Sequence, residues 1–203
     1  MAKKAVLKDE EGLKSWREMY IEAAQNNRGL RGYDIALHLA KKELVEEGHT
    51  ELIYDLATDY LMGTGCDKNV KESQKLDFVA AEHKDTRSIL RIARFYSLTE
   101  EQDDIYPPDD QESIKWYTKG AELGCVDCKV ELGEMYMYST VINHGIAEKY
   151  LKEAAQSGNV KAMEYLVELY RYSSASIDEA IYWCQCAIDN GSERAKTLRD
   201  TLN

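Results

Sequence analysis

The sequence contains very little proline: only Pro107 and Pro108 occur among 203 residues. Long helices are therefore permitted, and a fold built from many proline-bearing turns is disfavoured. Twelve glycines separate segments that are dominated by alanine, leucine, glutamate and lysine, which are strong helix formers. Hydrophobic residues make up 44% and charged residues 31% of the chain, which suits a globular or repeat protein.

The chain also lacks long apolar runs. No run approaches the roughly 18 apolar residues of a membrane span, and the opening MAKKAVLKDEEG has no apolar signal region. We therefore expect a cytoplasmic protein without a membrane partner. The formal net charge of −11 disfavours nucleic acid and anionic membrane surfaces. The same charge either attracts a basic protein partner or simply keeps the chain soluble.

Sequence signals of catalysis are missing as well. No phosphate-binding loop, nucleophile elbow or dinucleotide fingerprint occurs. None of the four histidines has a partner at the spacing of a triad or metal pair: His38, His49, His83 and His144. The five cysteines are odd in number and irregularly spaced, which argues against a disulfide framework. We predict that the chain is not an enzyme, has no catalytic residue and needs no metal or cofactor.

What the sequence does contain is a repeat, marked by the last residue of an Ala-rich, acidic stretch. The markers are Gly48, Lys84, Gly124, Gly158 and Gly191, spaced 36, 40, 34 and 33 residues apart. Residues four, eight and twelve positions after each marker form one face of an α-helix, and four repeats have tyrosine at position twelve. A second amphipathic helix ends at each marker, where glycine supplies a left-handed cap.

Three segments closely resemble the Sel1-like repeat, a relative of the tetratricopeptide repeat. They are SIKWYTKGAELGCVDCKVELGEMY, IAEKYLKEAAQSGNVKAMEYLVELY and IDEAIYWCQCAIDNGSERA. The resemblance implies an all-α protein, a right-handed α-solenoid of about five antiparallel helix pairs. It also implies a non-catalytic protein–protein interaction module, an adaptor or scaffold. The alternative is an immunity protein that neutralises a bacterial toxin or effector by tight binding.

We predict one α-solenoid domain over residues 1–203, because each helix pair can bury its apolar face only against its neighbours. The predicted parts are an atypical N-terminal helix pair at 12–48, repeats at 49–84, 85–124, 125–158 and 159–191, and a capping helix at 192–203. The loop 97–113 carries both prolines and accounts for the longest spacing. We make no prediction of oligomeric state.

The cysteine pair Cys125 and Cys128 forms a C-x-x-C motif, which in redox enzymes follows a strand and opens a helix. No strand is predicted here, and Cys128 stands where other repeats carry leucine, serine or alanine. A zinc site with Cys184 and Cys186 is disfavoured because those two residues lie about 200° apart around their helix. We interpret Cys128 as a small core residue.

The binding surface can be located through the relatives. In the tetratricopeptide superhelix, one stripe of each first helix lines a concave groove. The equivalent groove candidates here are Asp55, Met62, Arg87, Arg91, Arg94, Leu98, Glu131, Glu134, Tyr138, Tyr165, Glu168 and Tyr172. In one interpretation, the arginines form inter-repeat ion pairs with Asp55 and Glu131. In the other, the arginines hold a partner's carboxylates and the tyrosines hold its apolar side chains.

The acidic loop at 97–113 is a second candidate, with Asp103 and Asp104 beside Tyr106. It is either a solvated insertion or a contact for a basic protein partner. A calcium loop is disfavoured because the acidic spacing does not match D-x-D-x-D-G.

Overall fold

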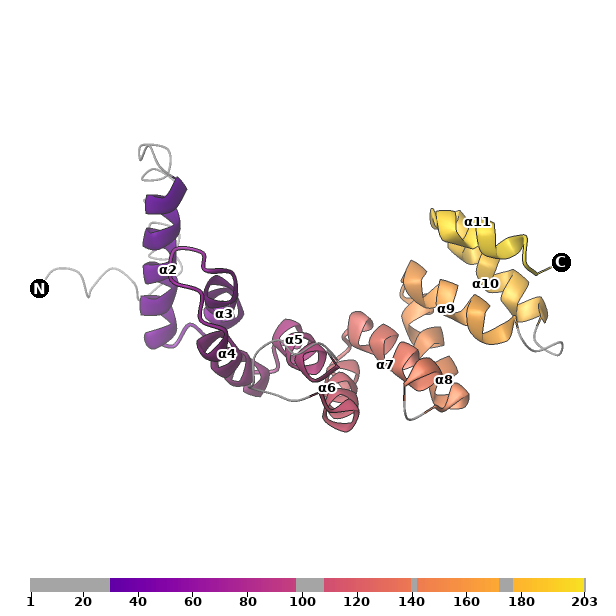
Figure 1. Cartoon of the computed structure of the whole chain (residues 1–203), viewed down its shortest axis with the longest axis horizontal. Helices are drawn as coiled ribbons and strands as arrows, with labels where there is room; N and C mark the ends of the chain where they lie inside the picture. Colours follow the sequence, from indigo (N-terminus) through magenta and orange to yellow (C-terminus); the bar gives the residue numbers. More distant parts are fainter. Residues whose placement is uncertain (1–29, 98–107, 140–141, 172–176, 203) are drawn as a thin grey trace, which may run out of the picture. The chain divides into compact units, whose positions relative to one another are not determined.

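The computed structural model describes residues 30–97, 108–139, 142–171 and 177–202. Every regular element in these ranges is helical (Figure 1). The chain divides into two compact units, Met1–Asp85 and Thr86–Asn203. The prediction that the repeats form one domain stays a prediction.

The first unit contains three α-helices and one 3-10 turn in its described part. They are α2 (Leu30–Glu46), η1 (Thr50–Leu52), α3 (Ile53–Met62) and α4 (Val70–Glu82). Helix α3 packs against α2 on one side and α4 on the other. The loop after α3 approaches α2 so closely that a Cβ added to Gly65 would lie 2.0 Å from the carbonyl oxygen of Asp34. The first helix of the predicted pair 12–48 lies outside the described residues.

The second unit contains seven α-helices in its described part. They are α5 (Thr86–Ser97), α6 (Asp110–Glu122), α7 (Val126–Tyr138), α8 (His144–Gln156), α9 (Val160–Tyr170), α10 (Ile177–Asp189) and α11 (Glu193–Arg199). Each helix of the unit packs against the next one along the chain. The two units together confirm the predicted all-α architecture of about five sequential helix pairs. None of the described helices is long and apolar enough to cross a membrane.

The repeat markers adopt the left-handed conformation that the sequence predicts. Gly48, Gly124, Gly158 and Gly191 have φ angles of 104°, 87°, 85° and 89°. Lys84 occupies the same conformation with a φ of 64°, alone among the described residues other than glycine. A side chain in this region costs about 1–2 kcal/mol. The helix end before α5 is therefore the least favourable of the five, as predicted.

Large and small side chains alternate between neighbouring helices in the core of the second unit. Gly133 of α7 abuts Leu151 of α8: a Cβ added to the glycine would lie 2.4 Å from Leu151 Cδ2. The same two repeat positions carry Ala93 and Tyr117 between α5 and α6, and both residues are buried in one cluster. The size of one residue thus sets the size that its neighbour can have.

The contact at Gly133 gives a stability prediction. We expect Gly133→Ala to lower the free energy of unfolding by about 1–3 kcal/mol, because the new methyl group overpacks the core against Leu151. The matched control is Gly145→Ala in α8, where the added Cβ meets nothing closer than 3.5 Å. Urea unfolding followed by circular dichroism measures both. Equal stability of the two variants would contradict the proposed packing.

Candidate protein-binding surface

The first helices of the repeats lie side by side in the second unit. Helix α7 packs on α9, and α9 packs on α11. Arg94 of α5 reaches Glu131 of α7. The polar residues that connect these helices form what we term the first-helix surface: Arg94, Glu131, Glu134, Tyr138, Lys161, Glu164, Glu168 and Arg194.

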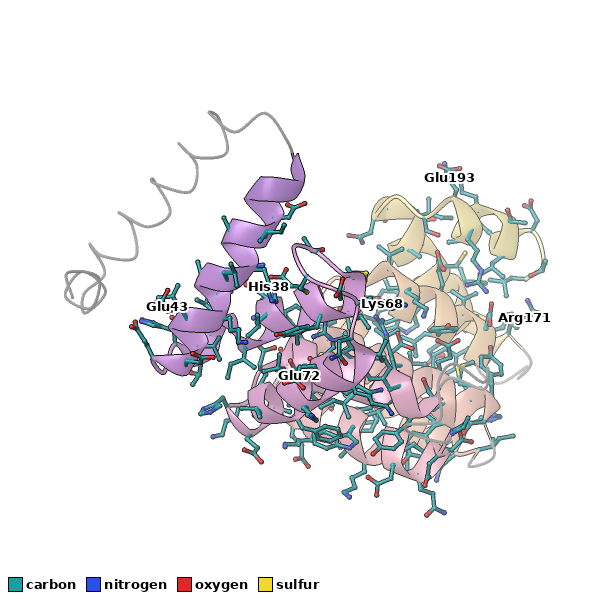
Figure 2. The ribbon with its side chains drawn as sticks, turned by 60° about the vertical axis from the view of Figure 1, so that its left-hand side comes forward. His38, Glu43, Lys68, Glu72, Arg171 and Glu193 are labelled. Atoms are coloured by element: carbon teal, nitrogen blue, oxygen red, sulfur yellow. The ribbon has the colours of Figure 1, made fainter. Side chains whose placement is uncertain are left out.

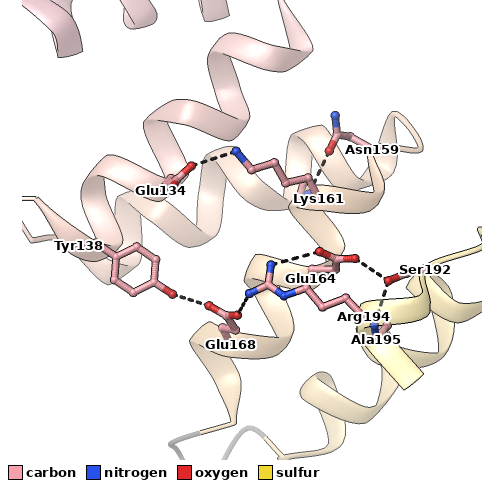
Figure 3. Close-up of polar contacts among 10 residues, drawn as sticks. Glu134, Tyr138, Asn159, Lys161, Glu164, Glu168, Ser192, Arg194 and Ala195 are labelled. Carbon is pink, nitrogen blue, oxygen red and sulfur yellow. Dashed lines mark hydrogen bonds and ion pairs between the residues drawn. The ribbon is translucent and has the colours of Figure 1, made fainter. Parts of the chain in front are cut away.

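Ion pairs join each first helix to the next. Arg94 Nη2 lies 2.8 Å from Glu131 Oε1, and this hydrogen bond raises the pKa of the guanidinium. Lys161 Nζ of α9 lies 3.1 Å from Glu134 Oε2 of α7 (Figure 3). The predicted inter-repeat pairing is therefore present for Arg94 and Glu131. Each of these contacts joins opposite charges on neighbouring first helices, so the repeats attract each other.

Glu168 on α9 is the point at which three helices meet. The Tyr138 hydroxyl of α7 donates a 2.6 Å hydrogen bond to its carboxylate, and Arg194 of α11 forms an ion pair with it (Figure 3). Arg194 also contacts Glu164, which accepts a hydrogen bond from Ser192, the N-cap of α11. Two adjacent carboxylates of α9 thus hold the last helix in place.

The tyrosines of this surface differ in exposure. Tyr138 is 57% exposed, and burial of its hydroxyl end together with the Glu168 hydrogen bond raises its pKa. Tyr165 was predicted to line the groove but is only 6% exposed. Its ring lies 6.4 Å from that of Tyr138 and 5.3 Å from the ammonium of Lys161. Tyr165 therefore packs against Tyr138 and offers little exposed area for contact with another protein.

An open pocket of about 290 Å³ lies where the end of α5 and the start of α6 meet α7. It is lined by Ser97, Asp110, Tyr117, Glu131, Glu134, Met135, Tyr138 and Ser139. Three of these described lining residues are carboxylates, and none is a cation. A pocket with acidic and aromatic walls favours a positively charged group over an anion.

The pocket floor contains Tyr117, a residue that the sequence analysis did not single out. It lies on α6 and is almost fully buried. Burial is the main cause that raises its pKa to about 12. The predicted stripe included only first helices, so a residue of a second helix was outside it. The one feature of the sequence that distinguishes Tyr117 is its large aromatic side chain, at a position where the neighbouring repeats have Asp77, Leu151 and Cys184.

The other groove candidates are placed as follows. Arg87 is exposed and Arg91 is partly buried on α5. Asp55 is partly buried and Met62 is exposed on α3, in the first unit. The candidates Leu98, Tyr172, Asp103, Asp104 and Tyr106 lie outside the described residues. The structure brings together Arg94, Glu131, Glu134, Tyr138, Tyr165 and Glu168, to which it adds Lys161, Glu164 and Arg194.

A separate polar cluster joins α2 and α3 in the first unit. His38 Nδ1 lies 3.3 Å from Asp59 Oδ2, and Lys41 Nζ lies 2.8 Å from Asp59 Oδ1. His38 and Asp59 are buried, and Figure 2 shows His38 on α2. The sequence shows no triad or metal partner for His38, and the fold supplies Asp59 from the next helix as its hydrogen-bond partner. Lys41 neutralises the buried carboxylate, so the cluster stabilises the contact between α2 and α3.

No group of three His, Cys, Asp or Glu residues in the described ranges could hold a metal ion.

Comparisons with known proteins identify the repeat family. The family model of the Sel1 repeat matches residues 50–76, 90–125, 126–159 and 161–192. A Sel1 repeat protein from Oxalobacter formigenes has a TM-score of 0.72 and 22% identity, with 96% of this chain and 78% of that chain covered.

Two further solved structures share the fold. The protective antigen c5321 of uropathogenic Escherichia coli has a TM-score of 0.72 and 20% identity, with 90% of this chain and 39% of that chain covered. Immunity protein Pa5087 from Pseudomonas aeruginosa has a TM-score of 0.54 and 18% identity, with 92% of this chain and 69% of that chain covered. At these identities the similarity shows the fold alone.

The meeting point at Glu168 predicts a measurable loss of stability. We expect Glu168→Ala to lower the free energy of unfolding by about 1–2 kcal/mol, because it removes one charge-assisted hydrogen bond and one ion pair between helices. Glu193→Ala is the control, because its pair with Lys196 is exposed and within one helix. Its effect should stay within about 0.5 kcal/mol. Chemical denaturation that gives the same value for both would refute the role of Glu168.

Tyr117 predicts how stability changes at alkaline pH. Its pKa is about 12 in the folded chain and near 10 when unfolded. Between these values the folded state binds more protons, so Tyr117 lowers stability as pH rises, by up to about 1.4 kcal/mol per pH unit. Tyr117→Phe should lose less stability over this range than the wild type. Identical alkaline unfolding curves would contradict the raised pKa.

Proposed function

Because this chain belongs to the Sel1 repeat family, we propose that it is a non-catalytic protein-binding module, an adaptor or scaffold whose first-helix surface takes a protein partner. The observation that carries this proposal is the open acidic pocket beside Tyr138. The pocket has the two features of an interface anchor site, an exposed tyrosine and charged groups held in fixed positions by neighbours. We also propose that the protein acts in the cytoplasm.

The chemistry of the pocket favours a basic partner. Arg94 is already paired with Glu131, so this arginine would have to leave its carboxylate to capture an acidic group. A carboxylate accepts up to about four hydrogen bonds, so Glu131 and Glu134 can hold a partner's lysine or arginine beside their internal cations. The ring of Tyr138 offers that cation an aromatic face. The net charge of −11 would speed the encounter with a basic protein.

A second candidate function is the inhibition of a toxin or effector. Three of the similar solved structures are Pseudomonas aeruginosa proteins, of which Pa5087 and PA5088 are immunity proteins. The similarity covers 90–92% of this chain. The acidic pocket and net charge suit a basic toxin as well as a basic adaptor partner. The two functions differ in what binding does to the partner: an inhibitor abolishes the partner's activity at equimolar ratio, whereas an adaptor leaves it intact.

The proposal predicts which variants lose the partner. A partner captured from the source organism's extract should bind purified wild-type chain directly. We expect Tyr138→Ala and Glu134→Lys each to weaken binding at least about tenfold, since hot-spot residues contribute about 2 kcal/mol or more. Binding should also weaken as salt rises, because a basic partner meets an acidic surface. Isothermal titration calorimetry of the purified pair measures both effects.

The matched controls are Tyr182→Ala and Glu179→Lys on α10. Tyr182 is 59% exposed, close to the value for Tyr138, and Glu179 is also exposed. Both controls should bind like the wild type. If the α10 variants lose binding and the α7 variants keep it, the first-helix surface is not the binding site. An assay of the partner's own activity then separates inhibitor from adaptor.

A further inference from the structure

The C-x-x-C motif lies at the start of α7, with Cys125 at the N-cap and Cys128 in the first turn of the helix. Cys125 is the N-cap residue, and its Sγ accepts a hydrogen bond from the backbone N–H of Cys128 at 3.2 Å. The equivalent N-caps of α9 and α11 are Asn159 and Ser192, which accept through oxygen. Sulfur is a weaker acceptor than oxygen, so capping by itself does not account for a cysteine at this position.

The fold does not require a cysteine at the position of Cys128 either. Cys128 is 0% exposed. The corresponding residues of the other repeats in this unit are Ser88, Ala162 and Ala195, all buried. A Cβ added to Gly120 of α6 would lie 2.4 Å from Cys128 Sγ, so the glycine leaves room for the sulfur atom. Helix packing would accept a smaller residue, which makes the sulfur itself the distinguishing feature.

The two thiols form an unequal pair. Cys125 is partly exposed and Cys128 is buried. The Cys128 side chain beside the Cys125 sulfur, together with the backbone N–H of Cys128, lowers the pKa of Cys125 to about 7. The same contact and burial raise the pKa of Cys128. An accessible thiolate beside a buried thiol is the arrangement of a nucleophilic and a resolving cysteine.

We propose that Cys125 and Cys128 form a reactive dithiol, which a low-molecular-weight disulfide of the glutathione type oxidises reversibly to an intramolecular disulfide. The Cys125 thiolate attacks one sulfur of the small disulfide, forms a mixed disulfide and releases one thiolate. Cys128 then loses its proton to solvent and attacks Cys125 Sγ, which releases the second thiolate. The protein gives up two electrons and two protons, and the small disulfide is reduced to two thiols.

This activity goes beyond the proposed binding function and does not depend on it. The other cysteines are built differently and serve as internal references. Cys184 is buried, its thiol donates to the carbonyl oxygen of Ala195 at 3.1 Å, and burial raises its pKa. Burial and the nearby Asp59 also raise the pKa of Cys66. Cys66 lies in the loop between α3 and α4, and Cys184 and Cys186 lie about 200° apart around α10, so neither thiol forms a C-x-x-C pair.

The test treats the full chain with iodoacetamide at pH 7 and follows each cysteine by peptide mass spectrometry. We expect Cys125 to react at least about tenfold faster than Cys66 and Cys184, because a larger fraction of it is thiolate. With oxidised glutathione, wild-type chain should form the Cys125–Cys128 disulfide and keep no glutathione. Cys128→Ala should keep glutathione on Cys125, because the resolving thiol is gone. Dithiothreitol should reverse both products.

The variants are chosen to keep the fold. Alanine is native at the position of Cys128 in two other repeats, and Cys128→Ser copies Ser88 should the alanine variant fold poorly. Cys125→Ser keeps an N-cap and should not react with glutathione at this site. The proposal is overturned if Cys125 reacts no faster than Cys66, or if wild type retains glutathione as Cys128→Ala does. Loss of this reactivity would leave the partner-binding test unaffected, so the two proposals fail separately.

Discussion

The close approach of each helix to the next is the constraint on which the rest of the second unit depends. A helix of this kind buries its apolar face against neighbouring helices, and where two helices approach closely a bulky residue meets a small one. The contact between Gly133 and Leu151 is one example. Ala93 and Tyr117 share another cluster at the same two positions. Because Tyr117 fills the space beside Ala93, its ring also becomes the floor of the acidic pocket.

The charged surface follows from that packing. Once α7, α9 and α11 lie side by side, the residue ten positions after one marker comes within reach of the residue three positions after the next. Glu134 meets Lys161, and Glu168 meets Tyr138 and Arg194. These contacts hold side chains in fixed orientations, which reduces the entropy lost when a partner binds. Exposed ion pairs contribute little to stability, so their main effect is on the geometry of the surface and, under the proposed function, on the choice of partner.

Helix α7 carries both proposed activities. Its first turn holds the Cys125–Cys128 pair, and its later turns carry Glu131, Glu134 and Tyr138. The pocket faces solvent on the first-helix surface, whereas Cys128 packs toward Gly120 on α6. The two sites therefore use different turns of one helix. Under the two proposals, a Sel1 repeat protein carries both a binding surface and a thiol that responds to the redox state of its surroundings.

The repeat could be predicted from the sequence alone, because helical periodicity and capping are local properties. Tyrosines twelve residues after each marker and the glycine caps predicted the helix pairs, and even the weak cap at Lys84 was correctly located. Six of the twelve groove candidates lie together in the second unit. Tertiary structure decided the burial of Tyr165, the pairing of His38 with Asp59 and the place of Tyr117 in the pocket. These three features depend on which side chains of separate helices meet. The distance between two helices is set by the sizes of residues that lie far apart in the chain.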